Sequence, residues 1–464
     1  MSWLRILLVP TVLGAFLHIS DAGERIDLSP GNDSGQLTHV SIQLDAGGHN
    51  LVRTDQEDKI RNSRKSLPMS VAAKLAYDQK QLNSAVADAT PGTRLAVRYY
   101  DEAEAVLKVG DTGRAPRLPD DHRLIVLQLG KHRPISFCPD GPLTRRQIDL
   151  IDVVGDSYNI DRLLPKQPVG EGDSWSNDAA VMGPLLTFDT VAACEVQSVL
   201  DEFNENYAKV RLAGDVQGMA DGAALEQEVR GVYLFDRKRR RITRLNLAVR
   251  EKRSIGGATP GVDAVAKVQI KVDPIEASPH LSDETIAKAT AAAGTPLQDV
   301  LYESPPLGFR IRHDRQWYET AERRDAVTFR RVDGGDLVAQ CRVTVLPPKS
   351  VGRQTSLDQF QKDIVFALGK NFGELVSSRQ WQNPAGLYCY EVIARGVVEG
   401  VPVEWHYYLA APESGNRLSL AVTVEKPMLD RLGEADHQLI DSLQLFPAMP
   451  PAQTAEQPTD KAVK

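Results

Sequence analysis

The chain has 464 residues, a formal net charge of −7 at pH 7, 42% hydrophobic residues and 25% charged residues. These values are ordinary for a globular protein, and the length allows two or three domains of about 150 residues each. The acidic balance argues against a general nucleic-acid-binding protein, so no nucleic-acid partner is predicted.

The first 22 residues predict a secretory signal peptide. Arg5 precedes an apolar run from Ile6 to Leu17, and Ser20 and Ala22 are small residues at the positions that a signal peptidase reads. A membrane anchor is the alternative, but the run is shorter than the about 20 apolar residues that span a bilayer. We therefore expect a periplasmic or secreted protein with no stable membrane span after cleavage.

Residues 36–278 predict an antiparallel β-rich domain, because apolar and polar residues alternate along most of this region. The alternation is clearest over residues 37–45, 69–77 and 93–100. It is typical of strands with one buried face and one wet face. The pattern leaves open whether this region forms one domain or two.

One helix is predicted near residues 144–154. Thr144 and Gln147 have the spacing of a capping box, and Gly155 follows the last apolar residues of the segment.

Two Gly-Asp-Ser triplets, at residues 155–157 and 172–174, raise the possibility of an esterase with Ser157 or Ser174 as its nucleophile. A serine hydrolase of this kind needs an Asp three residues before a His, so that the imidazole is oriented to accept the serine proton. None of the nine histidines has such an Asp. We interpret both triplets as turns and predict no enzymatic activity, with a hydrolase as the weak alternative.

The second half of the chain changes its pattern. Residues 279–304 are interpreted as a linker, residues 305–447 as a second domain, and residues 448–464 as a disordered tail, because the tail lacks apolar residues. Within the second domain, strand patterns alternate with amphipathic helices such as the one over residues 355–372. The fold class predicted for the whole chain is α+β.

The order of motifs over residues 307–446 resembles the family of PsbP, the extrinsic protein of photosystem II, and related small secreted bacterial domains. The matching residues are Gly308, Phe309, Ile311 and Trp317 in the opening strand, Ser356, Leu357 and Phe360 in a helix, Gly386 and Tyr390 in a hairpin, and Ile440, Ser442 and Leu443 in the final helix. The resemblance implies a PsbP-like α/β/α sandwich. It also implies a non-catalytic role in docking to, or assembling, another protein.

The stretch LLPKQPVGEGDSW, residues 163–175, is similar to an LP-x-x-P-V-x-V-G-D-S-W element of large exported bacterial β-proteins. Glu171 stands where an apolar residue is usual. The similarity implies a curved sheet or half-barrel of the kind that lipoprotein carriers use. The concave face of such a sheet could hold an apolar ligand, or it could pack on the protein's own helix.

The four cysteines divide equally between the two halves of the chain. Because export leads to an oxidising compartment, the pairs Cys341–Cys389 and Cys138–Cys194 are predicted as candidate disulfides. The alternative is four small buried thiols.

Candidate contact residues come from two surface predictions. Trp405, Tyr407 and Tyr408 form an aromatic group that we interpret as core plus the rim of an interface, because Tyr and Trp are also common interface anchors. Arg239 and Arg240 lie in a basic hairpin tip that could meet an anionic group, although such tips are usually only solvated.

No metal or other cofactor is predicted. Glu404 and His406 share a strand face, but no third ligand is apparent beside them. The sequence therefore predicts an exported, non-enzymatic binding or assembly protein that acts on an unidentified protein partner. A carrier of a lipid or other apolar ligand in the N-terminal domain is the alternative.

Overall fold

The computed structural model describes residues 24–31, 35–53, 64–82, 94–129, 134–291, 298–350, 354–413 and 415–448. The predicted signal peptide and all but the first residue of the predicted tail lie outside these residues.

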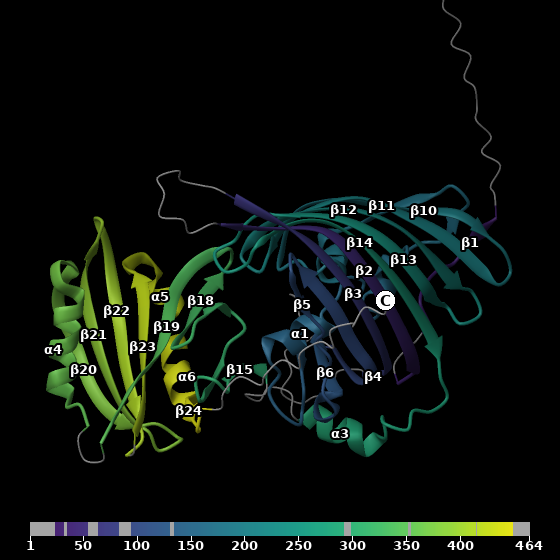
Figure 1. The fold of residues 1–464 in the computed structure, drawn as a ribbon. Coiled ribbons are helices and arrows are strands. Elements are labelled where there is room, and N and C mark those ends of the chain that lie inside the picture. The colour runs from purple at the N-terminus through teal and green to yellow at the C-terminus, as the bar shows by residue number, and fades with distance from the viewer. Residues whose placement is uncertain are drawn as a thin grey trace, which may run out of the picture.

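A twelve-stranded antiparallel sheet, in the spatial order β7-β6-β4-β3-β2-β14-β13-β12-β11-β10-β9 with β5 paired to β4, forms most of the N-terminal part (Figure 1). Its strands are β2 (Leu37–Arg53), β3 (Arg64–Leu82), β4 (Arg94–Val109), β5 (Thr112–Arg114), β6 (Leu124–Leu129), β7 (Ile135–Phe137), β9 (Ser174–Asn177), β10 (Thr190–Phe203), β11 (Tyr207–Ala220), β12 (Ala223–Asp236), β13 (Arg241–Arg253) and β14 (Gly261–Pro274). A separate short pair joins β1 (Arg25–Ile26) to β8 (Val169–Gly170). Because β2 pairs with β14, the first and last long strands close the sheet at its middle rather than at an edge.

The period-two pattern explains these strands. In β2, for example, Val40 and Ile42 are buried while Ser41 and Gln43 face outward. Successive side chains of a strand point to opposite faces, so alternation buries one whole face of the sheet.

The chain between β7 and β10 fills the concave side of this sheet. It contains α1 (Arg145–Ile151), η2 (Ile160–Leu163) and α2 (Ala179–Leu185). Figure 1 shows α1 beneath the arch of long strands. The following side chains from this segment join the main hydrophobic core: Leu143, Ile148, Leu150, Ile151, Ile160, Leu163, Leu164, Met182, Leu185, Leu186 and Phe188. The predicted capping box is present at the start of α1, where Thr144 and Gln147 each accept the other's backbone N–H.

At one end, the sheet is also covered on its outer face. The short η1 (Asp120–His122) leads into β6 there, and α3 (Asp283–Ala291) packs over β4 and β6. Ile286 and Ala289 of α3 contact Leu95 and Val97, which alternate with the inward-facing residues of β4. This end of the sheet therefore has a core on both faces.

The C-terminal unit is built on a seven-stranded antiparallel sheet in the order β17-β18-β19-β23-β22-β21-β20. Its strands are β17 (Trp317–Glu322), β18 (Ala326–Asp333), β19 (Asp336–Lys349), β20 (Phe372–Gln382), β21 (Tyr388–Val398), β22 (Val401–Ala411) and β23 (Gly415–Glu425). A three-stranded sheet contains β15 (Val300–Ser304), β16 (Phe309–His313) and β24 (Gln444–Leu445). The helices are α4 (Leu357–Leu368), η4 (Gly369–Asn371), η5 (Lys426–Met428), α5 (Leu429–Leu432) and α6 (Ala435–Ser442).

The prediction of an α+β fold class with a PsbP-like α/β/α sandwich is wrong. The chain is mostly β, with large antiparallel sheets in both halves. The helical patterns read from the sequence correspond to short helices, of which α4 has 12 residues, α6 has 8 and α5 has 4. Amphipathic periodicity predicts where a helix can cover a sheet, but it does not show that helices form complete layers.

The predicted disulfides are also not formed, and all four cysteines are free thiols. Cys341 on β19 and Cys389 on β21 belong to one core, but β23 and β22 lie between their strands. Three strand spacings amount to about 14 Å, whereas a disulfide requires Cα atoms within about 7 Å. Cys138 follows β7 at one end of the large sheet, while Cys194 is on β10 near the other end. Burial raises the pKa of the Cys138 thiol to about 11 and that of Cys389 to about 12, which leaves both thiols protonated.

Contacts from α1 join the two units. The Arg145 guanidinium donates to the backbone carbonyls of Arg315 and Trp317, and it lies 4.5 Å from the centre of the Tyr318 ring. On the opposite side of the junction, Arg330 donates to the Gly257 carbonyl over 2.6 Å. The C-terminal partners in both contacts lie in or next to β17 and β18.

Residues 143–188, the inner segment, pack against the concave face of the sheet, and Leu185 on α2 is fully buried there. We therefore expect the Leu185 side chain to contribute strongly to the stability of the fold. We expect Leu185→Ala to lower the free energy of unfolding by about 2–5 kcal/mol, because the change leaves a cavity. Val106→Ala, at a β4 position that is 50% exposed, is the control and should change it by less than about 0.5 kcal/mol. Urea denaturation followed by circular dichroism measures both, and equal losses would contradict the assigned packing.

Candidate ligand-binding site

A cavity of about 880 Å³ lies between the concave face of the large sheet and the end of α1. Its size falls within the range of about 300–1,000 Å³ that is usual for small-molecule sites. The apolar residues that line it are Leu44, Val71, Ala73, Ala105, Leu107, Leu150, Val153 and Val154.

Small side chains in the middle of the sheet create this space. Leu44, Ala73 and Ala105 are register partners across β2, β3 and β4. All three point toward the inner segment, but the two alanines do not reach the residues that follow α1. The sequence analysis raised an apolar ligand on the concave face but identified none of the residues of this site, although two alanines at inward-facing positions of neighbouring strands were a signal.

The rim of the cavity is charged. Arg114, Arg146 and Arg253 contribute three guanidinium groups, and Asp149 and Asp152 contribute two carboxylates. Arg114 and Arg146 also face Glu319 of the C-terminal unit: burial raises the pKa of Glu319, and the two cations act against that rise. A ligand with an apolar chain and an anionic end would match this arrangement, because its charge would meet the guanidinium groups while the chain is buried.

The first Gly-Asp-Ser triplet anchors the inner segment near this cavity. Gly155 has a φ of 86°, in the left-handed region that favours glycine, and its N–H donates to the Leu185 carbonyl over 2.8 Å. Both Asp156 carboxylate oxygens accept from the buried Arg98 guanidinium, each at 2.7 Å. The Ser157 hydroxyl is buried and lies 2.8 Å from the Tyr77 hydroxyl.

The second triplet stabilises a turn. Asp173 accepts from the Gly170 N–H over 2.9 Å and pairs with Arg25 at 2.8 Å, while Ser174 is exposed at the start of β9. Within the described residues, neither Ser157 nor Ser174 is hydrogen bonded to a histidine.

The predicted contact residues are mostly inside the protein or already paired. Trp405 is 6% exposed and Tyr408 is completely buried, while Tyr407 is half-buried, so Trp405 and Tyr408 belong to the core. Arg239 pairs with Asp236 of its own turn, and Arg240 pairs with Asp27 and with the Ser29 carbonyl. The basic tip therefore attaches the N-terminal segment to the β12–β13 turn.

An acid–imidazole–hydroxyl cluster lies in the C-terminal unit, although the sequence analysis predicted no assembled group of this kind. The His406 ring is held between Asp436, at 2.5 Å from Nδ1, and Glu404, at 2.9 Å from Nε2, and the Tyr408 hydroxyl donates to Asp436 over 2.7 Å. Burial lowers the pKa of His406, but hydrogen bonds and charge from both carboxylates outweigh it and raise that pKa. Because both ring nitrogens are engaged, the cluster ties α6 to β22 and leaves no free nitrogen to act as a base.

A second ion cluster lies beside the first. His437 bonds Glu391 over 2.5 Å through Nε2 and Glu434 through Nδ1, and Arg379 donates to Glu391. The hydrogen bond to Glu391 is the largest cause that raises the pKa of His437 to about 9. Burial would raise the pKa of Glu391, but His437 and Arg379 lower it to about 2.

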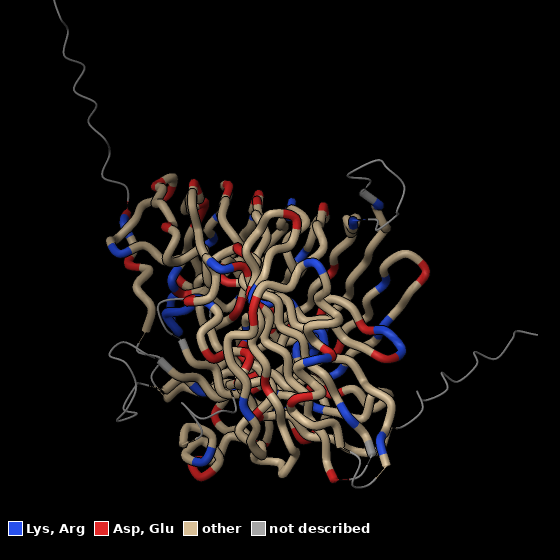
Figure 2. The backbone as a smooth tube through the Cα atoms, turned by 90° about the vertical axis from the view of Figure 1, so that its left-hand side faces the viewer, with Lys and Arg blue, Asp and Glu red and all other residues tan. Residues whose placement is uncertain are grey.

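Lys or Arg segments and Asp or Glu segments are interspersed along the backbone tube in the view of Figure 2. Among the described residues, no helix is both long and apolar enough to cross a membrane.

Comparisons with known proteins give only distant likenesses. No protein-family model matches the chain. No curated protein sequence matches it either. A crystal structure from Bacteroides thetaiotaomicron VPI-5482 is 15% identical with a TM-score of 0.23; the match covers 31% of this chain and 47%, about half, of that chain. The cyanobacterial PsbP (CyanoP) from Synechocystis sp. PCC 6803 is 13% identical with a TM-score of 0.26, over 32% of this chain and 92% of that one. The outer membrane protein OprD from Pseudomonas aeruginosa is 9% identical with a TM-score of 0.12, and the match covers 86% of this chain and 96% of that chain. None of these TM-scores establishes a shared fold.

Because His437 has a raised pKa in the folded protein, we expect the free energy of unfolding to depend on pH. A folded pKa of about 9, above the ordinary value of about 6.5, means that the stabilisation is complete below pH 6.5 and is lost as the pH rises through 9. We expect His437→Gln to lower the free energy of unfolding by about 1–3 kcal/mol at pH 6 and by much less at pH 9.5.

Urea denaturation at several pH values measures this difference, with His49→Gln, an exposed β2 position, as the control. A His437→Gln loss that is the same at pH 6 and at pH 9.5 would show that packing, rather than the charged imidazole, is responsible.

Proposed function

We propose that this protein is an exported, non-enzymatic carrier of a ligand with an apolar chain and an anionic end, which is held in the cavity under the large sheet. The cavity carries the proposal, because it is lined by aliphatic side chains and by the guanidinium groups of Arg114 and Arg146. A third guanidinium, that of Arg253, pairs with Asp221 and Glu251. Export rests on the predicted signal peptide.

The energetics of such binding are sufficient for a carrier. About ten methylene groups buried at about 0.8 kcal/mol each contribute about 8 kcal/mol, which corresponds to a dissociation constant near 1 μM before the cost of immobilising the chain. A charge-assisted hydrogen bond between a guanidinium and the anionic end adds orientation as well as affinity.

This proposal puts the carrier function ahead of assembly through protein contacts. The aromatic residues expected to make those contacts are largely buried, and the basic tip is paired within the chain. A carrier still has to exchange its ligand with other molecules. We expect the C-terminal unit to take part in that exchange, because Glu319 lies near Arg114 and Arg146 of the cavity rim.

Two neighbouring alanines on β3 test the cavity. Ala73 is buried and lines the cavity, whereas Ala72 is exposed on the opposite face. We expect Ala73→Trp to weaken binding of a fluorescent fatty acid by at least about tenfold, equivalent to about 1.4 kcal/mol, because the indole occupies the space of the chain. Ala72→Trp adds the same side chain outside the cavity and should bind within about twofold of the wild type.

Fluorescence titration measures both affinities, and native mass spectrometry of the purified wild type should show a retained lipid. The unfolding midpoint of each variant checks that it is folded. Equal affinity of two folded variants would contradict the cavity as the binding site.

A substitution of Arg146 tests whether the protein recognises the anionic end of the ligand. Arg146→Gln should weaken binding of dodecanoate about fivefold or more while leaving binding of dodecanol nearly unchanged, because only the carboxylate gains from the guanidinium. The control is Arg230→Gln, which removes a guanidinium on β12 that pairs with Glu228. Isothermal titration calorimetry with the two ligands distinguishes a loss of charge recognition from a general loss of binding, and equal weakening for both ligands would be evidence against the proposed orientation.

A further inference from the structure

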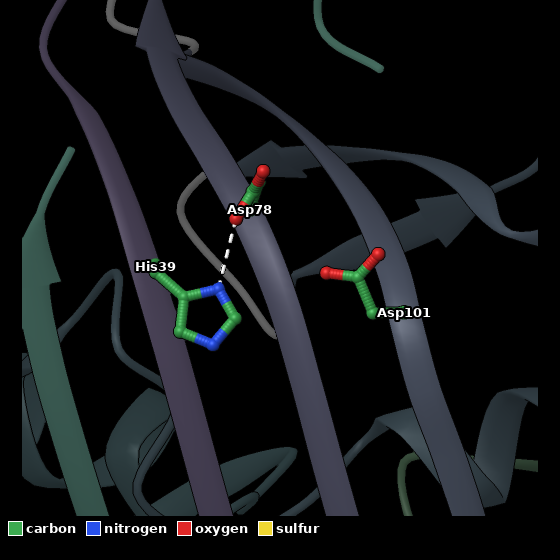
Figure 3. A group of neighbouring side chains, drawn as sticks. All are labelled: His39, Asp78 and Asp101. Carbon is green, nitrogen blue, oxygen red and sulfur yellow. Dashed lines mark hydrogen bonds and ion pairs between the residues drawn. The ribbon is translucent and has the colours of Figure 1, made fainter. Parts of the chain in front are cut away.

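A second group of chemically active side chains lies outside the cavity, on the same large sheet. His39 on β2, Asp78 on β3 and Asp101 on β4 come from three adjacent strands, and their side chains point toward one another in Figure 3. The candidate ligand atoms of the three residues all lie within 4.8 Å of one another. His39 Nδ1 and Asp78 Oδ1 are 2.9 Å apart.

Strand register assembles this group. His39 and Asp78 are direct partners in the β2–β3 ladder. A bulge in the β3–β4 ladder pairs Tyr77 with Tyr100 and Ala76 with Glu102, so Asp101 is an extra residue without a cross-strand partner. A bulge of this kind redirects a side chain, and here it brings the Asp101 carboxylate to the His39–Asp78 pair.

The group is separate from the proposed carrier cavity. The neighbouring residues Val40, Tyr77 and Tyr100 are buried in the main core on the concave side. Because side chains alternate across a strand, His39 and Asp78 lie on the outer face of the sheet. None of the three residues lines the cavity.

The electrostatics of the group favour a bound cation. The Asp78 side chain is only 9% exposed, and among the described residues its one hydrogen-bonding or ion-pair partner is the His39 ring. No lysine or arginine in the described part of the chain pairs with the carboxylate of Asp78 or Asp101. Two neighbouring carboxylates, one of them largely buried, repel each other unless a positive charge lies between them.

We propose that His39, Asp78 and Asp101 bind a divalent transition-metal ion of the Zn²⁺ type. An imidazole nitrogen with two carboxylate oxygens suits such an ion, whereas Ca²⁺ and Mg²⁺ prefer oxygen ligands alone. Zinc–ligand distances near 2.0–2.1 Å place adjacent ligand atoms about 3 Å apart, and the His39–Asp78 separation of 2.9 Å is close to that spacing. The three ligand atoms lie within 4.8 Å of one another, so binding would draw the Asp101 carboxylate inward. Binding would replace the proton shared by these two side chains.

The site has an open side. Asp101 is exposed, so an ion can arrive from solvent and keep water in its remaining positions. Since the three ligands come from consecutive strands, the bound ion would also cross-link β2, β3 and β4.

Isothermal titration calorimetry of the full mature chain with ZnCl₂ tests the proposal. We expect saturable binding of one ion per chain and no such binding of CaCl₂. His39→Gln and Asp101→Asn should each weaken Zn²⁺ binding at least tenfold. Zn²⁺ should also raise the unfolding midpoint of the wild type more than that of either variant.

Two residues on β2 provide matched controls, because His49 and Asp45 are exposed and belong to the same strand as His39. His49→Gln and Asp45→Asn should keep wild-type affinity, and circular dichroism checks that all four variants are folded. The proposal is overturned if no saturable Zn²⁺ binding occurs, if the His39 and Asp101 variants bind as tightly as the wild type, or if His49→Gln weakens binding equally, which would indicate adventitious binding to surface histidines.

Discussion

Burial of the concave face of the twelve-stranded sheet by residues 143–188 is the constraint on which the rest of this structure depends. A sheet of this size presents a wide apolar surface that its own strands cannot cover. The chain between β7 and β10 supplies the cover through α1, η2 and α2, and one continuous core results. The Arg98–Asp156 pair and the Gly155 turn hold this inner segment in place. The same segment carries Arg145, which reaches the C-terminal unit.

The proposed carrier site is the part of that face which the inner segment leaves uncovered. Where the sheet offers Ala73 and Ala105, the residues after α1 do not fill the gap, and a cavity with an apolar wall follows. Protein interiors are normally packed without voids of this size. The proposed ligand would occupy this space, which opens beside three arginines and two aspartates. The proposed metal site at His39, Asp78 and Asp101 lies on the other face of the same strands.

Buried charge organises the C-terminal unit in another way. His406 and His437 each lie between carboxylates, and together they attach α6 to β21 and β22. Removing one partner from such a cluster leaves an uncompensated buried charge, which costs far more than the loss of a surface pair. Both ring nitrogens of His406 and both of His437 contact carboxylates.

Local sequence determined the strands and the capped helix, because period-two alternation and the Thr144–Gln147 box act over a few residues. It did not determine the fold class, since the lengths of α4, α5 and α6 depend on packing against the sheets. It suggested a ligand on the concave face but did not predict which residues line the cavity, and it did not predict the His39 group or the Asp436–His406 pair. His406 and Asp436 are 30 positions apart and His39 and Asp78 are 39 positions apart, and only the tertiary structure brings such residues together. The predicted disulfides failed for the same reason, because shared membership of a core does not fix the distance between two strands. Alternation assigns each side chain to a face, but the tertiary structure decides which side chains meet on that face.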